Sequence, residues 1–229
     1  MRILTYNTRG SIGMDNMRST PRIVQVVRQL TPDVVCFQEI HKRTMQAGKE
    51  DQPALLADGL GRPFRFQSNL SLGMGKYGIG IAYRGELQSS QELYLPSKTE
   101  PRGALKVCLR DVAGFSRLTV FCTHWGLDPE ERSQQAIALA GSVRAAGSPV
   151  IVCGDFNEDA EGEGVRSLLD LSGLKDADAA LNRPTFIADN PTTRIDFVMH
   201  SSDLVVRNVE VIPTLASDHL PLLVDFERA

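Results

Sequence analysis

The sequence predicts an α/β fold with mixed sheets, and two stretches carry this prediction. Near the N-terminus, residues 2–6, 20–30 and 34–37 are typical of strand, helix and strand, because an amphipathic segment lies between two apolar runs. Farther along, residues 104–109 and 118–122 indicate consecutive antiparallel strands joined by a turn. A chain of 229 residues that is 42% hydrophobic, without a Ser/Gly/Pro-rich linker or an internal repeat, is expected to form one domain over residues 1–229.

The expected helices begin at residues that can cap them. Ser19 or Thr20 can cap the first helix, and Asp128 can cap a later one, because their side chains accept hydrogen bonds from free backbone N–H groups. Leu55, Ile137 and Ala138 are expected on the inner faces of their helices. The other two helices are expected at residues 51–60 and 164–171.

Two segments between these elements leave their interpretation open. Residues 62–77 mix basic and aromatic side chains around a Gly-Met-Gly turn, which fits either a lip over a substrate or a hairpin with two buried phenylalanines. Residues 175–193 form a long polar loop, with Phe186 as its expected anchor. The remaining strands are expected at residues 78–83, 92–96, 150–153, 194–199, 205–212 and 222–226.

The first two strands each deliver a polar residue at the C-terminal end. Asn7 follows the first strand and Glu39 follows the second. If the two strands run parallel, both side chains lie at the same edge of the sheet. A carboxylate directly after four apolar residues is costly to bury without a partner. Glu39 therefore needs a cation or a strong hydrogen-bond donor, and the candidates for the cation are a metal ion or an Arg or Lys in a salt bridge.

The stretch Pro149 to Asn157 carries a carboxylate and an amide beyond a buried strand. Four apolar residues are followed by Gly154, and then Asp155 and Asn157 stand two residues apart. If extended geometry continues, Asp155 and Asn157 point the same way and can hold a water molecule and an oxyanion. The alternative is an ordinary turn, which both residue types favour.

Three more polar groups accompany strands in the second half of the chain. His124 follows a strand and precedes a glycine, where it can contact a phosphate or act as an acid or base. Asp196 lies inside an expected strand and needs an Arg or His partner. Asp218 and His219 are adjacent, so they can serve one site only if the backbone turns between them.

Charge is divided unevenly along the chain. Residues 1–115 carry 16 Lys/Arg and 10 Asp/Glu, whereas residues 116–229 carry 9 and 18. An acidic half can supply metal ligands, and a basic half can face an anionic substrate. No dense Lys/Arg block occurs, so tight non-specific binding to nucleic acid is not indicated.

The cysteines and the N-terminus suggest a reducing location. Cys36, Cys108, Cys122 and Cys153 stand singly in apolar runs without CxxC spacing, so we expect buried free thiols. Such thiols fit a reducing compartment. The chain enters a strand directly and has no apolar run of about 18 residues for a membrane span, so a cytoplasmic location is expected.

Taken together, the polar residues at strand ends are rich in oxygen and poor in nitrogen, and they include no thiolate. Several acids at one sheet edge repel one another unless a cation is present. Oxygen ligands favour Mg²⁺ or Mn²⁺ over zinc, and such a site supports attack of water on phosphorus.

Six stretches, in order and spanning nearly the whole chain, resemble the endonuclease/exonuclease/phosphatase superfamily, the Mg²⁺-dependent phosphohydrolases related to DNase I. The resemblance implies a four-layer α/β sandwich in which two packed, mixed or antiparallel sheets are flanked by helices. The stretches are Leu4-Thr5-Tyr6-Asn7, Phe37-Gln38-Glu39, Thr123-His124, Gly154-Asp155-Phe156-Asn157, Arg194-Ile195-Asp196-Phe197 and Ser217-Asp218-His219.

The resemblance also implies a role for each site residue. Glu39 would be the main metal carboxylate, assisted by Asn7 and Asp218. Asp155 would orient or deprotonate the attacking water. His219, held by Asp196, would act as an acid or base or as a phosphate ligand.

Four further residues complete the set that the resemblance implies. Asn157 would position the water and the phosphate, and His124 would donate to a phosphate oxygen. Arg102 would reach the phosphate or form a salt bridge, and Arg9 is expected to contact the substrate.

Departures from the family pattern narrow the expected function. Abasic-site endonucleases usually have Gln-Glu-Thr-Lys where this chain has Gln38-Glu39-Ile40-His41, and Tyr in place of His124. Both differences argue against repair of abasic sites. We expect a monomeric Mg²⁺- or Mn²⁺-dependent phosphodiesterase or nuclease, and we prefer a nucleic acid or nucleotide to a lipid headgroup as its substrate. The alternatives are a phosphomonoesterase, a sphingomyelinase-like or phosphoinositide phosphatase-like enzyme, and a non-catalytic binding module on the same fold.

Overall fold

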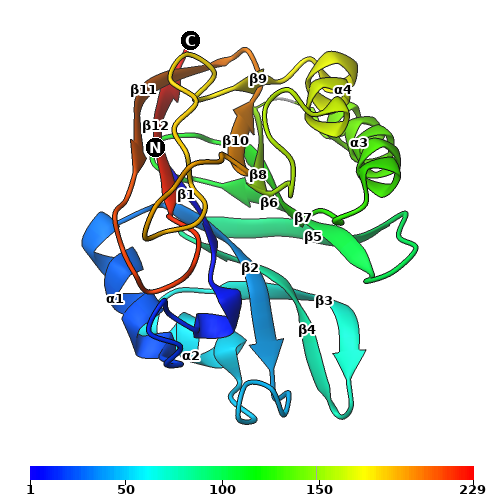
Figure 1. The fold of residues 1–229 in the computed structure, drawn as a ribbon. Coiled ribbons are helices and arrows are strands. Elements are labelled where there is room, and N and C mark those ends of the chain that lie inside the picture. The colour runs from blue at the N-terminus through cyan, green and yellow to red at the C-terminus, as the bar shows by residue number, and fades with distance from the viewer. Residues whose placement is uncertain (148) are drawn as a thin grey trace.

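The computed structural model describes residues 1–147 and 149–229, and within them two six-stranded sheets pack face to face with four helices outside (Figure 1). Helices α1 (Thr20–Leu30) and α2 (Gln52–Leu60) cover the outer face of the first sheet, and α3 (Pro129–Arg144) and α4 (Glu163–Ser172) cover the second. The predicted four-layer sandwich is confirmed.

The two sheets are both mixed. The first has the strand order β11-β12-β1-β2-β4-β3 and the second β5-β6-β7-β8-β10-β9. The strands of the first sheet are β1 (Arg2–Asn7), β2 (Val34–Lys42), β3 (Phe64–Leu72), β4 (Gly75–Tyr83), β11 (Leu204–Val211) and β12 (Leu222–Arg228). Those of the second are β5 (Glu86–Leu95), β6 (Arg102–Arg110), β7 (Leu118–His124), β8 (Val150–Asp155), β9 (Lys175–Asp176) and β10 (Asp196–His200).

Each sheet contains one parallel strand pair, and these two pairs deliver the polar strand ends. β1 and β2 run parallel with Asn7 opposite Gln38, as the sequence predicts. β7 and β8 run parallel with His124 opposite Asp155. The other strand pairs in the described residues are antiparallel.

The helix caps agree with the sequence, whereas the predictions that Leu55, Ile137 and Ala138 face inward were wrong. Ser19 Oγ accepts from Arg22 N at 3.3 Å, and Asp128 Oδ1 accepts from Glu131 N at 3.0 Å. Leu55 and Ile137 are 41% and 60% exposed. In α3 the buried face is formed by residues 136, 139, 140 and 143, and residue 137 is rotated from it by about 100° on a 3.6-residue helix.

The core between the sheets contains three of the four cysteines. Cys36, Cys122 and Cys153 are fully buried and free. Cys108 is partly exposed, contrary to prediction, because it faces away from the core on β6 while Val107 and Leu109 face inward.

Residues 64–83 form the β3–β4 hairpin, so the hairpin interpretation of this segment is confirmed. Phe64 and Phe66 are partly buried, and Phe64 stacks on Phe37 with ring centroids 5.8 Å apart.

The two ends of the chain are neighbours, since the Met1 amino group donates to Phe226 O at 2.8 Å (Figure 1). None of the described helices has both the length and the apolar character needed to span a bilayer.

Candidate active site

The strand ends bring the predicted polar residues together at one end of the sandwich. Asn7 ends β1, His124 ends β7 and Asp155 ends β8. Asp196 begins β10, where it pairs in register with Asp155. Asp196 therefore stands at the start of its strand, whereas the sequence suggested the middle. Glu39 lies in β2, one residue beyond the partner of Asn7.

Asn7 links the two central carboxylates. Its Nδ2 donates to Glu39 Oε1 at 3.1 Å and to Asp155 Oδ2 at 2.8 Å. Its Oδ1 accepts from the backbone N–H of Arg9 at 3.0 Å, which fixes the amide in this orientation. The buried Asn7 side chain thus spaces Glu39 and Asp155, and it presents an N–H rather than its oxygen to them.

Asn157 reaches the site through a turn, which is the alternative to extended geometry that the sequence left open. The φ angle of Asn157 is 49°, in the left-handed region. Its backbone N–H donates to Asp155 Oδ1 at 2.9 Å. Its Nδ2 donates to Trp125 O at 2.9 Å and lies 3.1 Å from His124 Nε2. The turn and the site are therefore one feature, because the turn places Asn157 against His124.

His219 is held by the carboxylate of Asp196, as the resemblance implied. His219 Nδ1 lies 2.9 Å from Asp196 Oδ2, and Thr185 Oγ1 donates to the same oxygen at 2.6 Å. The ring of Phe186 covers the imidazole, with centroids 4.8 Å apart. This environment leaves His219 Nε2 pointing at Asp155, 3.7 Å from Oδ2. The His219–Asp196–Asp155 arrangement can hold and move a proton.

Burial and mutual charge set the protonation of these groups. Burial raises the pKa of Asp155 to about 7, although the nearby His219 opposes the rise. Burial alone would lower the pKa of His219, but the carboxylates of Asp196 and Asp155 outweigh it and raise that pKa to about 10. Burial and the charge of Arg102 hold the pKa of His124 well below its usual value. The site therefore contains a carboxylate base that titrates near neutrality, a cationic His219 and a neutral His124.

Glu39 has the environment of a metal ligand. It sits at the β-bulge between Phe37 and Ile40 with a φ of 60°, a strained conformation that turns its side chain into the site. Within the described residues Glu39 forms no ion pair, because Arg9 and Arg102 pair with other acids. Its hydrogen-bond donor is Asn7. Burial raises the pKa of Glu39, although the hydrogen bond from Asn7 and the charge of His219 oppose the rise.

The oxygen donors around Glu39 fit a divalent cation. The negative charge of Asp218 is close enough to Glu39 to raise the pKa of Glu39. Asp218 Oδ2 lies 3.4 Å from Arg9 Nε. Carboxylates of this kind suit a hard divalent cation. Donor atoms of Asp155, Asp196 and His219 also lie within 4.8 Å of one another. In that second group a hydrogen bond joins His219 to Asp196, an arrangement that allows proton transfer between these side chains.

The two predicted arginines occupy different environments. Arg102 is 6% exposed at the start of β6, next to Gly103, which pairs with His124. Its Nη1 lies 3.0 Å from Glu100 Oε1, while its Nε is buried and has no hydrogen-bond partner in the described residues. Arg9 is more exposed and lies beside Asp218. Arg102 therefore has both the predicted salt bridge and a free donor.

The sequence did not reveal the residues that support the site from loops. Thr185 belongs to the long polar loop, where nothing marks its contact with Asp196. Ser217 belongs to the Ser217-Asp218-His219 stretch, in which the sequence assigned it no role. In the structure its Oγ donates to Asn7 O at 2.8 Å. Tyr77, on β4 rather than in a loop, packs against His41 with tilted rings whose centroids are 4.9 Å apart. Burial and the charge of Glu39 raise the pKa of Tyr77. Tyr77 thus lies on the Glu39 side of the site.

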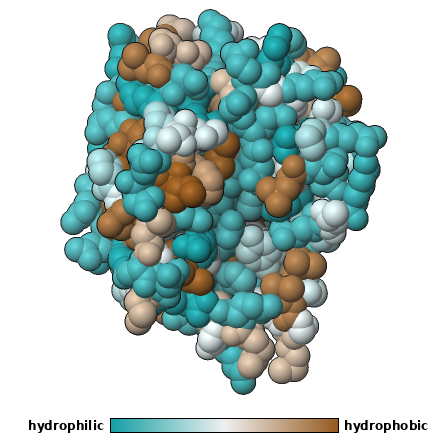
Figure 2. All heavy atoms as spheres, viewed as in Figure 1, coloured by the Kyte–Doolittle hydropathy of each residue, from teal (hydrophilic) through white to brown (hydrophobic). Residues whose placement is uncertain are grey.

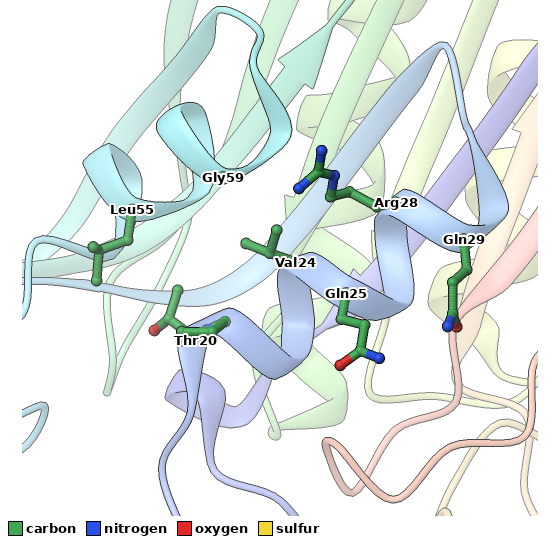
Figure 3. A pocket seen from close by; sticks show the side chains of 8 residues that line it. Thr20, Val24, Gln25, Arg28, Gln29, Leu55 and Gly59 are labelled. Atoms are coloured by element: carbon green, nitrogen blue, oxygen red, sulfur yellow. The ribbon is translucent and has the colours of Figure 1, made fainter.

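A separate hollow between α1 and α2 has no such chemistry (Figure 3). Its volume is about 510 Å³, and Val24, Leu55 and Gly59 form much of its wall. No carboxylate or histidine lines it. The polar strand ends therefore remain the candidate active site.

Comparisons with known proteins concern the family and the fold of the chain. The model of the endonuclease/exonuclease/phosphatase family matches residues 4–219. The uncharacterized protein YbhP of Escherichia coli K12 is 26% identical over 168 residues, covering 69% of this chain and 66% of YbhP. The match thus spans slightly less than two thirds of that curated relative.

Solved structures share the fold at low sequence identity. An endonuclease/exonuclease/phosphatase from Beutenbergia cavernae has a TM-score of 0.85 and 23% identity, covering 100% of this chain and 72% of that one. A mannosyl-6-phosphatase from Bacteroides thetaiotaomicron has a TM-score of 0.81 and 20% identity, covering 99% of both chains. At these identities the likeness concerns the fold.

Proposed function

Because the chain belongs to the endonuclease/exonuclease/phosphatase family, whose members are typically phosphoester hydrolases, we propose that it hydrolyses phosphodiester bonds with a divalent metal ion. One observation supports this proposal above the others. Asp155 Oδ2 accepts a hydrogen bond from Asn7 Nδ2 at 2.8 Å, and the same oxygen lies 3.7 Å from His219 Nε2. A carboxylate set between a fixed amide and a cationic imidazole is suited to activating a water molecule.

In the proposed reaction, each side chain has a separate task. Asp155 orients the attacking water and takes its proton, since its pKa of about 7 makes it a base near neutrality. His219 stays protonated through Asp196 and either donates to the leaving oxygen or binds a phosphate oxygen. Asn157 and the neutral His124 position the phosphate. Stabilisation of charge on phosphorus by such fixed donors is worth about 10²-fold or more in rate for each donor.

The metal site would be formed by Glu39 and Asp218, with Asn7 holding Glu39 in place. When bound, a Mg²⁺ or Mn²⁺ ion supplies Lewis-acid stabilisation of the phosphate oxygens. Arg102 contributes a buried positive charge and a free Nε for a further phosphate contact. Arg9 stands at the more exposed side of the same site.

The test is a direct comparison of two model substrates. Purified protein with Mg²⁺ or Mn²⁺ is given bis-p-nitrophenyl phosphate and, separately, p-nitrophenyl phosphate. We expect faster hydrolysis of the diester, with loss of activity in EDTA and in Asp155→Asn. Faster hydrolysis of the monoester would make the protein a phosphomonoesterase. The absence of hydrolysis of either compound, with folding intact, would overturn the proposal.

A further inference from the structure

The free end of the first sheet carries a surface unlike the active site, formed by Met45, Leu72 and Met74. We name it the methionine tip. Met74, in the β3–β4 turn, is fully exposed, and Met45, in the loop after β2, is 73% exposed. Leu72 lies between them at the end of β3. In Figure 2, hydrophobic side chains gather at the lower end of the molecule, over this turn and loop. A hollow of about 410 Å³ is lined by Arg43, Met45, Lys49, Leu72, Met74 and Gly75.

The backbone holds the methionine tip in a fixed shape. The loop after β2 is closed by hydrogen bonds from Arg43 N to Glu50 O at 2.7 Å and from Lys49 N to Thr44 O at 2.8 Å. A Cβ added to Gly75 would lie 2.5 Å from Thr44 N, so the hairpin turn rests directly on this loop. The two methionines are therefore displayed to solvent by an ordered platform, although burying them would be favourable.

Positive charge surrounds the methionine tip. Lys42 and Lys76 are cross-strand partners below it, and Lys49 is exposed beside it. In the described residues these three lysines form no ion pair. The nearby acids have partners other than these lysines. Asp51 pairs with Arg43 at 3.1 Å, and Glu50 Oε2 accepts from Thr20 Oγ1 at 3.0 Å.

From this combination, we propose that the methionine tip binds the surface of an anionic phospholipid bilayer. Flexible apolar side chains can enter the boundary between headgroups and acyl chains, while the lysines attract the negative surface. A nucleic acid would use the lysines but would leave Met45 and Met74 in water. Charge complementarity therefore favours a lipid surface that offers both an apolar layer and anionic groups.

Bilayer binding would place the active site near the membrane surface. Glu39 and Lys42 lie on the same strand, three residues apart, which is about 10 Å at the rise of a β-strand. Binding through the methionine tip involves none of the residues assigned to the active site. The proposal therefore goes beyond hydrolysis, and it can be tested in the absence of any catalytic activity.

The test is co-sedimentation of the full chain with vesicles of phosphatidylcholine alone and of phosphatidylcholine with phosphatidylglycerol. We expect binding to the anionic vesicles, weakened at least about tenfold in Met45→Ser/Met74→Ser and in Lys49→Glu/Lys76→Glu, since each basic residue near the surface contributes about 1 kcal/mol. Ile137→Ser is the matched control, because Ile137 is 60% exposed on α3 and should not affect binding. Melting temperatures check that the variants fold.

Three results would overturn the proposal. The first is wild-type protein that remains in solution with anionic vesicles. The second is equal binding by the wild type and both tip variants. The third is a wild-type dimer, seen by light scattering, that Met45→Ser/Met74→Ser converts to a monomer, since the methionine tip would then join two copies of the chain.

Discussion

Asp196 Oδ2 accepts a hydrogen bond from Thr185 and lies 2.9 Å from His219 Nδ1, so one carboxylate oxygen fixes the His219 imidazole and anchors a loop. The other oxygen, Oδ1, is buried and has no hydrogen-bond partner in the described residues. Asp196 also pairs in register with Asp155. Asp196, which holds the imidazole, and Asp155 are therefore fixed relative to each other by two adjacent strands.

Replacing Asp196 with Asn should impair turnover more than stability. The amide keeps the size of the side chain but removes the charge that keeps His219 protonated and orders its ring. We expect kcat to fall by about 10²-fold or more while KM changes little. Steady-state kinetics on bis-p-nitrophenyl phosphate would check this. A wild-type kcat in this variant would mean that the pair has no catalytic role.

The metal-free protein should lose stability as the pH rises above neutrality. The folded state raises the pKa of His219 to about 10, above its unfolded value near 6.5. The folded state therefore binds more protons between these values, and its stabilisation is full below about pH 6.5 and is lost towards pH 10. Melting temperatures in EDTA across this window should fall, by about 2–4 °C for each kcal/mol lost.

His219→Gln provides the comparison for this pH effect. Without the imidazole, the decline between about pH 6.5 and pH 10 should be shallower than in the wild type. Parallel curves for the two proteins would show that another group controls the alkaline loss of stability.

Binding of Mg²⁺ should raise the melting temperature through Glu39. A ligand that binds the folded state alone stabilises it in proportion to the logarithm of its concentration. We expect a rise with Mg²⁺ in the wild type and a much smaller rise in Glu39→Gln. Asp58→Asn, on the exposed surface of α2, is the control and should behave as the wild type. An equal rise in Glu39→Gln would place the ion elsewhere.

Two glycine substitutions should have opposite effects on stability. A Cβ on Gly154 would lie 2.1 Å from Thr123 O, so Gly154→Ala should push β7 and β8 apart and destabilise the protein by about 1–3 kcal/mol. Gly141 lies in α3 with open space around it, and Gly141→Ala should stabilise by about 0.5–1 kcal/mol. Urea unfolding measures both. Equal stability of the two variants would contradict the close contact of β7 with β8.

Much of the site could be predicted from the sequence because its residues follow apolar runs. Asn7, His124 and Asp155 each end a buried strand, and their placement depends only on strand pairing. The left-handed conformation of Glu39 could not be predicted, because it depends on a bulge that forms only when β2 pairs with β4. The contact of Thr185 with Asp196 depends on how a long loop folds back, which no periodic pattern records.

Exposure of individual apolar residues was the least predictable feature. Ile137 fits an amphipathic pattern that is shifted by one residue, and only packing against the second sheet decides between the two alignments. Met45 and Met74 have no pattern of their own, because turns lack a regular period. Their exposure depends on how the β3–β4 turn packs against the loop after β2.

The hydrogen bond between the Met1 amino group and Phe226 O determines where the protein can be immobilised or fused. Met1 precedes β1, whose other end is Asn7, so Met1 lies about 20 Å from Asn7 at the strand rise of about 3.3 Å per residue. An affinity tag, a fluorophore or a surface linker at either terminus would therefore leave the active site and the methionine tip accessible. Joining the two termini through a short linker would allow circular permutants opened at other loops.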